Sequence, residues 1–479
     1  MTVRVRRGAA AIAGIAALSL VLAACGGDDG DGGATSTDDA AAGGGEEAAI
    51  PLPEDAPELD CAQFEQFGDL SGTQVTTYSS IANYPEYAYY ETAWSTFEDC
   101  TGVDVVPEWS QDFETQIVVR AQSGNAPDVA LVPQPGLLAN LVLDTGAVVE
   151  PAPEVKALVE ENFSEDLVAY GTVDGTFYAG PNSSNSKSFV WYSPPAFEEA
   201  GYEVPETWED MIALSDQIVA DNPDGSVKPW CAGIESGVAT GWPVTDWMED
   251  VMLREYGGDV YDQWVSHDIP FNGEEVLTVI EKVGTILQNP EYVNGGFGDV
   301  QTIASTDFTD AGTPITEGNC YMHRQASFYR NFWPEGTNVA EDGDIWAFYF
   351  PANEGATEKP VLFGGEFVTL FDDRPEVQAF AYFLATDEYH NIRAFIPGEE
   401  GGFISANVGL DPANLKNPLD QAMYEQFNDP GAVLRFDASD LMPAAVGSGQ
   451  FWTSMTDWIN GTVDEQGALD AIENAWPSS

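Results

Sequence analysis

Residues 240–247 (TGWPVTDW) bring together the two kinds of side chain with which a protein can hold a hydroxylated ring. Flat aromatic faces stack on the apolar face of a pyranose, and planar polar groups pair with its hydroxyls. Gly241 and Pro243 break the chain before a predicted helix, which favours a Trp242 that faces a cleft, with Asp246 as a polar partner. The alternative for Trp242 is a place in the core, and for Trp247 we favour the core because aromatics at helical spacing usually face it.

Three charged residues are further candidates for ligand contact. Arg324 follows Cys320 in a predicted strand, and its planar fork of donors suits vicinal hydroxyls or a carboxylate, with Gln325 beside it. A surface salt bridge is the alternative for Arg324. Lys187 is a candidate because basic residues are scarce in this chain. Glu366 follows two glycines, which permit the backbone to bend as a hinge. Its carboxylate can either accept hydrogen bonds from sugar hydroxyls or serve as a structural partner of Arg324 or Lys187.

The elements that must position these side chains alternate between strands and helices. Such alternation predicts an α/β fold with a largely parallel sheet, in which ligands lie beyond the carboxyl ends of the strands. Ser80 and Gln134 follow two of the predicted strands, so we expect both at a ligand site. The predicted strands are 73–78, 103–106, 129–132 and 188–192, and the predicted helices are 84–99, 114–123 and one that Thr207 caps. A hairpin turn is predicted at 174–178, and two helical runs broken at 460–461 are predicted within 451–476.

The chain is long and unusually acidic. A chain of 479 residues is too long to fold around one compact core, so two lobes are expected. It carries 16 basic and 80 acidic residues, and loss of the first 24 residues would leave 13 minus 80, a net charge of −67. This charge excludes nucleic acid and anionic lipid surfaces as partners. We interpret it as a solvated surface suited to a saline habitat, because salt screens its self-repulsion.

The N-terminus has the layout of an export signal. Arg4, Arg6 and Arg7 precede an apolar run that ends in Leu22-Ala23-Ala24-Cys25, similar to the lipobox of bacterial lipoproteins. We therefore expect residues 1–24 to be removed, Cys25 to be lipidated, and residues 25–58 to form a flexible linker at the outer face of the cytoplasmic membrane. A transmembrane anchor is an alternative, although the run is short for one. A secretory signal with an incidental cysteine is another.

The remaining cysteines predict two disulfides. Cys61–Cys100 is the favoured pair, which leaves Cys231–Cys320, although four cysteines allow three connectivities. No Cys/His cluster and no metal spacing among the histidines is present, so we expect neither a metal nor a cofactor. Walker, HExxH and GxSxG motifs are absent. A glycosidase pair of carboxylates stays open as an alternative.

Several motifs, taken in order, give the chain a resemblance to a known family. Residues 122–136 (QSGNAPDVALVPQPG), 173–192 (VDGTFYAGPNSSNSKSFVWY) and 205–216 resemble motifs of the extracellular solute-binding proteins of sugar ABC transporters, which include maltose-binding proteins. Residues 229–250, 261–272 and 319–336 are similar to the subgroup that binds α-glucosides.

The resemblance implies a type II periplasmic-binding-protein-like fold: two lobes, three crossing segments and a cleft that closes on its ligand. One lobe would span 59–185 and 365–400, the other 186–364, with helical segments in 401–479 completing them. Asn185 and Lys187 would lie in the first crossing, Glu366 in the second, and Phe328 near the cleft. Gly401-Gly402-Phe403 is a third crossing or a ligand loop.

The function that the resemblance implies is capture of an α-glucoside by a monomer and its delivery to a membrane permease. A lipid-anchored glycoside hydrolase is one alternative. The same fold with a non-sugar solute is another.

Overall fold

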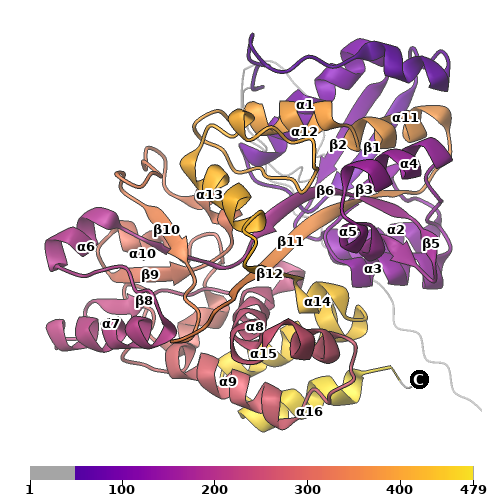
Figure 1. The fold of residues 1–479 in the computed structure, drawn as a ribbon. Helices are drawn as coiled ribbons and strands as arrows, with labels where there is room; N and C mark the ends of the chain where they lie inside the picture. Colours follow the sequence, from indigo (N-terminus) through magenta and orange to yellow (C-terminus); the bar gives the residue numbers. More distant parts are fainter. Residues whose placement is uncertain (1–48, 478–479) are drawn as a thin grey trace, which may run out of the picture. The chain divides into compact units, whose positions relative to one another are not determined.

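The computed structural model describes residues 49–477, so the predicted signal peptide and Cys25 lie outside the described residues. Its larger sheet has six strands in the order β12-β11-β3-β1-β2, with β6 also paired to β11 (Figure 1). β1, β2 and β3 run parallel, as the sequence predicts, and β11 is antiparallel to β3. These strands are β1 (Gln74–Ser79), β2 (Asp104–Trp109), β3 (Val129–Val132), β6 (Ala179–Ser186), β11 (Lys359–Leu370) and β12 (Ala432–Phe436).

Helices cover both faces of this sheet. Side chains alternate along β3, so Val129 and Leu131 pack against α1 and α11 while Ala130 and Val132 pack against α2 and α3. All four residues of β3 are buried. The helices of this lobe are α1 (Glu86–Thr101), α2 (Phe113–Ser123), α3 (Pro135–Asn140), α4 (Pro153–Asn162), α5 (Glu165–Tyr170), α11 (Pro375–Leu384) and α12 (Asp387–Phe395).

The second lobe is built on a four-stranded sheet in the order β10-β7-β9-β8. Its strands are β7 (Phe189–Tyr192), β8 (Lys228–Trp230), β9 (Cys320–Arg324) and β10 (Trp346–Tyr349). Helices α7, α8, α9, α15 and α16 share one hydrophobic core with this sheet. The remaining helices are α6 (Pro194–Ala200), α7 (Trp208–Asp221), α8 (Trp242–Val265), α9 (Glu274–Leu287), α10 (Thr313–Thr316), α13 (Pro418–Phe427), α14 (Ala438–Leu441), α15 (Trp452–Ile459) and α16 (Glu465–Ala475).

The chain passes between the sheets along long strands. β6 ends at Ser186 and β7 of the second sheet begins at Phe189, while β11 pairs with β12 in its first half and with β3 in its second (Figure 1). The backbones of β6 and β11 approach closely at Gly365, where a Cβ atom would lie 2.2 Å from the carbonyl oxygen of Ser183. Only glycine fits at this contact.

The predicted elements are confirmed with small shifts of their ends. The hairpin turn lies between β4 (Thr172–Val173) and β5 (Thr176–Phe177), and the Thr207 hydroxyl accepts a hydrogen bond of 3.1 Å from the Asp210 amide at the start of α7. The C-terminal runs are α15 and α16. β12 is a strand in a segment for which we expected helices.

The two predicted disulfides are confirmed. Cys61 is bonded to Cys100, at the end of α1, and Cys231 is bonded to Cys320, at the start of β9. Ile50, which the sequence assigns to the linker, packs against the first lobe, and its carbonyl oxygen accepts a 2.7 Å hydrogen bond from Thr92. Ile50 therefore belongs to the packed structure of the first lobe and not to a flexible linker that extends to residue 58.

Candidate ligand-binding cleft

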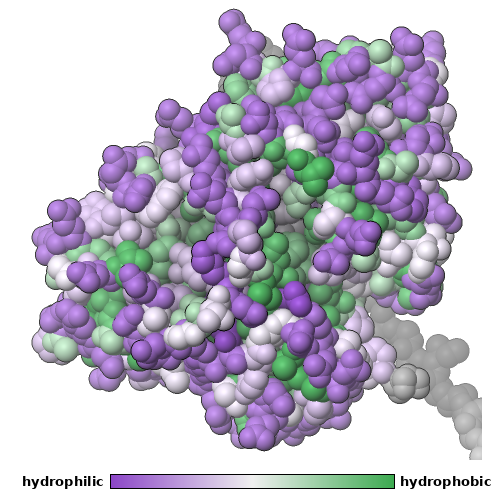
Figure 2. Space-filling model, viewed as in Figure 1, coloured by the Kyte–Doolittle hydropathy of each residue, from purple (hydrophilic) through white to green (hydrophobic). Residues whose placement is uncertain are grey.

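A cavity of about 230 Å³ is lined by residues of both lobes. Hydrophilic side chains dominate the face of the molecule in Figure 2, and hydrophobic ones gather near its centre. The two lobes contribute different chemistry to the cavity. We call the contributions the polar wall, defined by Ser80, Glu86, Glu114, Gln134 and Glu366 of the first lobe, and the aromatic wall, defined by Trp242, Phe308, Phe328 and Phe332 of the second.

The polar wall is positioned by the carboxyl ends of parallel strands. Ser80 follows β1 and Gln134 follows β3, as the sequence predicts for a ligand site in an α/β sheet. Glu114 lies in the first turn of α2, and its side chain accepts a 3.2 Å hydrogen bond from Nε2 of Gln134. The wall thus presents hydroxyl, amide and carboxyl groups on a rigid frame.

Glu366 lies on β11 at the centre of the polar wall. Its carboxylate accepts hydrogen bonds from four neutral donors: Ser79 (3.4 Å), Tyr90 (3.1 Å), Asn182 (3.4 Å) and Ser183 (2.9 Å). Burial raises its pKa, and these donors oppose the shift. No described ion pair joins Glu366 to Arg324 or Lys187, so its structural partners are not the two that we considered.

The aromatic wall consists of rings that are only half-buried, unlike the aromatic residues of the core. The Trp242 ring lies 5.2 Å from that of Phe308 and 6.0 Å from that of Phe328. Trp242 begins α8 directly after Gly241, whose φ is +113° and where a Cβ atom would lie 2.2 Å from the carbonyl oxygen of Trp452. Trp247, in contrast, is buried and packs against Trp230 and Phe350, as predicted.

A buried ion network adjoins the cleft, and two of its residues, Lys187 and Asp437, also line the cavity. The ammonium of Lys187 contacts Asp437 and lies 3.0 Å from Asp246, and it is 5.3 Å from the Trp242 ring. Arg324 pairs with Asp250 at 2.9 Å and with Asp246 at 3.4 Å. The network therefore fixes the start of α8, which carries Trp242, against the crossing between β6 and β7.

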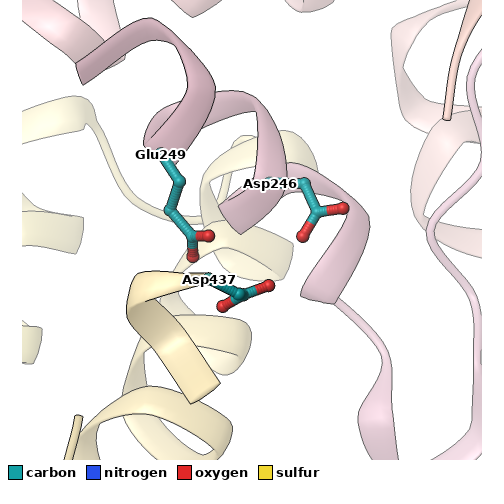
Figure 3. A group of neighbouring side chains, drawn as sticks. All are labelled: Asp246, Glu249 and Asp437. Carbon is teal, nitrogen blue, oxygen red and sulfur yellow. The ribbon is translucent and has the colours of Figure 1, made fainter. Parts of the chain in front are cut away.

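Three carboxyl groups of this network converge. Asp246 and Glu249 come from one face of α8, and Asp437 precedes α14 (Figure 3). An oxygen of each lies within 4.8 Å of the others, a spacing that can hold a cation. The Lys187 ammonium already contacts Asp246 and Asp437, so it supplies this positive charge.

The carboxyl groups of the network divide into two electrostatic classes. Burial opposes ionisation of Asp437, but Lys187 and hydrogen bonds lower its pKa to about 2. Burial raises the pKa of Asp246 to about 7, and burial together with the charge of Asp437 raises those of Glu249 and Asp440 well above their usual range. Burial also opposes the charge of Lys187, but Asp246 and Asp437 raise its pKa.

Most of the candidate residues from the sequence lie at the cavity. Those that line it are Ser80, Gln134, Asn185, Lys187, Trp242, Phe328 and Glu366. Gly402 and Phe403 also line it. The structure places Asp246, Arg324 and Gln325 behind the wall: Asp246 and Arg324 pair within the network, and Gln325 accepts a 2.7 Å hydrogen bond from the amide of Ala326. Arg324 forms buried ion pairs, not the surface salt bridge that was its alternative.

Sequence reasoning missed several residues of the cavity. Asp437 and Asp440 follow β12, a strand that was not predicted, so nothing marked them as strand-end residues. Glu86 and Glu114 lie in the first turns of helices that follow strands, and this position could have indicated that they line a ligand site. Phe308 lies in a loop without a recognisable pattern.

A comparison with protein families identifies the family to which this two-lobed protein belongs. The family described as bacterial extracellular solute-binding protein matches residues 81–391. The chain belongs to the bacterial extracellular solute-binding proteins. Within this solute-binding family it is 38% identical to the alpha-glucosides-binding periplasmic protein AglE of Rhizobium meliloti (strain 1021), over 87% of this chain and 90% of that protein.

Two further matches bear on fold and ligand. The chain is 39% identical to the osmoprotective compounds-binding protein GgtB of Synechocystis, over 86% of this chain and 94% of that protein. The structure superimposes on the solute receptor AcbH, described as having an exclusive preference for β-D-galactopyranose, with a TM-score of 0.69, 16% identity, and coverage of 84% of this chain and 98% of that one. The fold is thus the two-lobed type II fold of sugar receptors, as the resemblance implied. Among residues 49–477 no helix is long and apolar enough to cross a membrane.

Proposed function

We propose that this protein is the solute-binding lipoprotein of an ABC importer and that it captures an α-glucoside, or a related oligosaccharide, in the cleft between its lobes. The observation that carries the proposal is the opposition of the aromatic wall to the polar wall. Half-buried rings offer a stacking surface for a pyranose, and the facing hydroxyl, amide and carboxyl groups offer partners for its hydroxyls.

Selectivity for one sugar would arise from the polar wall. A wrong sugar leaves buried donors or acceptors unpaired, and each unpaired group costs about 1–3 kcal/mol. The names of the two relatives AglE and GgtB point to α-glucosides and to osmoprotective compounds respectively. We favour the α-glucoside because the sequence resemblance to that subgroup is extensive.

A thermal-shift panel tests this function. A ligand that binds only the folded state raises its stability by about 2.7 kcal/mol at a hundredfold excess over Kd. We expect maltose, trehalose, sucrose or a longer α-glucan to raise the midpoint, and peptides, polyamines and glycerol phosphate esters to leave it unchanged. A shift with one of the non-sugar solutes alone would favour the same fold with a different cargo.

The membrane anchor is part of the proposal and rests on Cys25, outside the described residues. A lipid at Cys25 would hold the receptor within linker reach of the permease. In a cell that processes such signals, we expect the wild-type protein in the membrane fraction and Cys25→Ala in the soluble fraction. Equal partition of both proteins would contradict the anchor.

A glycoside hydrolase is the second candidate because carboxyl groups line the cavity. We propose binding without turnover, since the family consists of receptors. Incubation of purified protein with maltose and trehalose distinguishes the two functions. Release of glucose above background would contradict a receptor role.

A further inference from the structure

One end of the cleft offers hydrogen-bond acceptors and few donors. Glu114, Gln134 and Asp440, which we call the acceptor corner, all line the cavity. α14, which carries Asp440, packs against α3, which begins directly after Gln134. Burial is the largest influence that raises the pKa of Asp440, followed by the charges of Asp437, Asp246 and Glu114, whereas the charge of Lys187 lowers it. Asp440 and Glu114 are therefore within electrostatic reach of each other.

Gln134 presents an unpaired acceptor to this corner. Its Nε2 donates to Oε1 of Glu114 at 3.2 Å, which fixes the orientation of the amide. The residue is only 5% exposed, and its Oε1 is buried. This oxygen has no hydrogen-bond partner among the described residues. The same is true of the buried Oδ1 of Asn185, which also lines the cavity. A buried acceptor without a donor is costly, so a ligand that brings donors is favoured here.

The charges that line the cavity are also unbalanced. The carboxyl groups on its surface are those of Glu86, Glu114, Glu366, Asp437 and Asp440, and Lys187 is the one cation among the described residues that line it. Lys187 is already paired with Asp246 and Asp437. Within residues 49–477, Asp437 alone of these five carboxyls has an ion-pair partner. Glu114 and Asp440 form no ion pair among the described residues, although the charge of Lys187 acts on Asp440.

We propose that the ligand carries a protonated amine in addition to a sugar ring, so that the substrate class is an amino-substituted α-glucoside whose ammonium group binds in the acceptor corner. This inference rests on the proposed function, because the ring would stack on the aromatic wall. An ammonium suits the corner because it has three donors and no acceptor. A neutral hydroxyl brings one donor and an acceptor of its own, so it satisfies fewer of the acceptors of the corner.

Calorimetry with matched sugars tests the proposal. The probes are trehalose and maltose, and the analogues of each in which one hydroxyl at a time is replaced by an amino group. We expect at least one amino analogue to bind about 10- to 100-fold more tightly than its neutral parent near pH 6, the gain of a charge-assisted hydrogen bond over a neutral one. In Glu114→Gln and in Asp440→Asn, the ratio of the affinity for the amino analogue to that for its neutral parent should fall towards one.

Two controls separate the corner from the acidic surface. Glu154→Gln removes an exposed carboxyl from the first turn of α4 and should preserve the ratio. At about 1 M salt, where the Debye length is near 3 Å, attraction to surface charge disappears whereas the ratio set by the corner persists. Two corner variants keep the test usable if one of them folds poorly.

The outcomes distinguish the inference from the function. Binding of the neutral sugars with no preference for any amino analogue overturns the inference and leaves the proposed function in place. A preference that disappears at high salt, or that survives both corner variants, also overturns it. Failure of every sugar, neutral or amino, overturns both.

Discussion

The two walls of the cleft face the same cavity but are positioned in different ways. Ser80 and Gln134 of the polar wall follow strands of a parallel sheet, whose carboxyl ends must meet at one edge. The rings of the aromatic wall come from a helix start, a loop and a short 3-10 helix, and their positions depend on contacts such as that of Gly241 with Trp452. The position of the polar wall therefore follows from the topology of the sheet, and that of the aromatic wall follows from local packing.

The two walls also differ in the charged interactions that stabilise the structure around them. Lys187 lies in the crossing between the lobes and contacts Asp437 and Asp246 behind the aromatic wall. In the polar wall, by contrast, the four described residues that donate hydrogen bonds to Glu366 are neutral. Changes behind the aromatic wall should therefore affect folding, and changes in either wall should affect binding.

The largest effect is expected from Lys187→Met. The substitution leaves Asp246 and Asp437 buried without their cation, which destabilises a protein by about 3–5 kcal/mol. Urea unfolding followed by tryptophan fluorescence measures the loss. Lys156→Met is the matched control, because its pair with Glu160 is exposed and contributes about 0.5 kcal/mol or less. Equal losses in the two variants would show that the network does not fix the second lobe.

Removal of the Trp242 ring should give the next largest effect, on affinity. A stacked aromatic that is truncated to alanine typically costs about 2 kcal/mol or more, or roughly 30-fold in Kd. Calorimetry with the best sugar of the panel measures it. Trp476→Ala is the control, since this ring stacks on His267 at the C-terminal helix and does not line the cavity. If Trp242→Ala binds as the wild type does, the aromatic wall is not a stacking surface.

A smaller loss of affinity is expected for Glu366→Gln in the polar wall. The amide keeps the size of the side chain but loses charge and one acceptor, so we expect about 1–2 kcal/mol, or roughly 5- to 30-fold in Kd. Glu150→Gln, on the exposed surface, is the control. An unchanged Kd in Glu366→Gln would mean that this carboxylate only organises its four donors.

The smallest effect is a pH dependence of stability. Burial raises the pKa of Glu86 from its ordinary 4.5 to about 7, so between these values the folded protein binds more protons than the unfolded chain and stability falls as pH rises. Glu86→Gln does not titrate. Because Glu86 is only half-buried, its free energy of unfolding should match that of the wild type near pH 4.5 and exceed it by about 1 kcal/mol at pH 8. A difference in the free energy of unfolding between Glu86→Gln and the wild type that stays constant from pH 4.5 to pH 8 would contradict the raised pKa of Glu86.

The same contrast explains what could be predicted from the sequence. Buried runs such as Val129–Val132 and capping at Thr207 indicate elements by local pattern, and strand ends then indicate Ser80 and Gln134. Asp437 and Asp440 depend on β12, whose five residues include four that are only half-buried and give little strand signal. Arg324 shows the limit of residue type: a fork of donors suits a ligand or a carboxylate, and only tertiary packing placed two aspartates beside it.

The linkage of the bound sugar tests the central claim most directly. Isothermal titration of the wild-type protein should compare trehalose and maltose, which are α-linked, with cellobiose, the β-linked isomer of maltose. We expect saturable binding of an α-linked sugar and at least tenfold weaker binding of cellobiose. Equal binding of all three, or no heat with any of them, would contradict a receptor for α-glucosides.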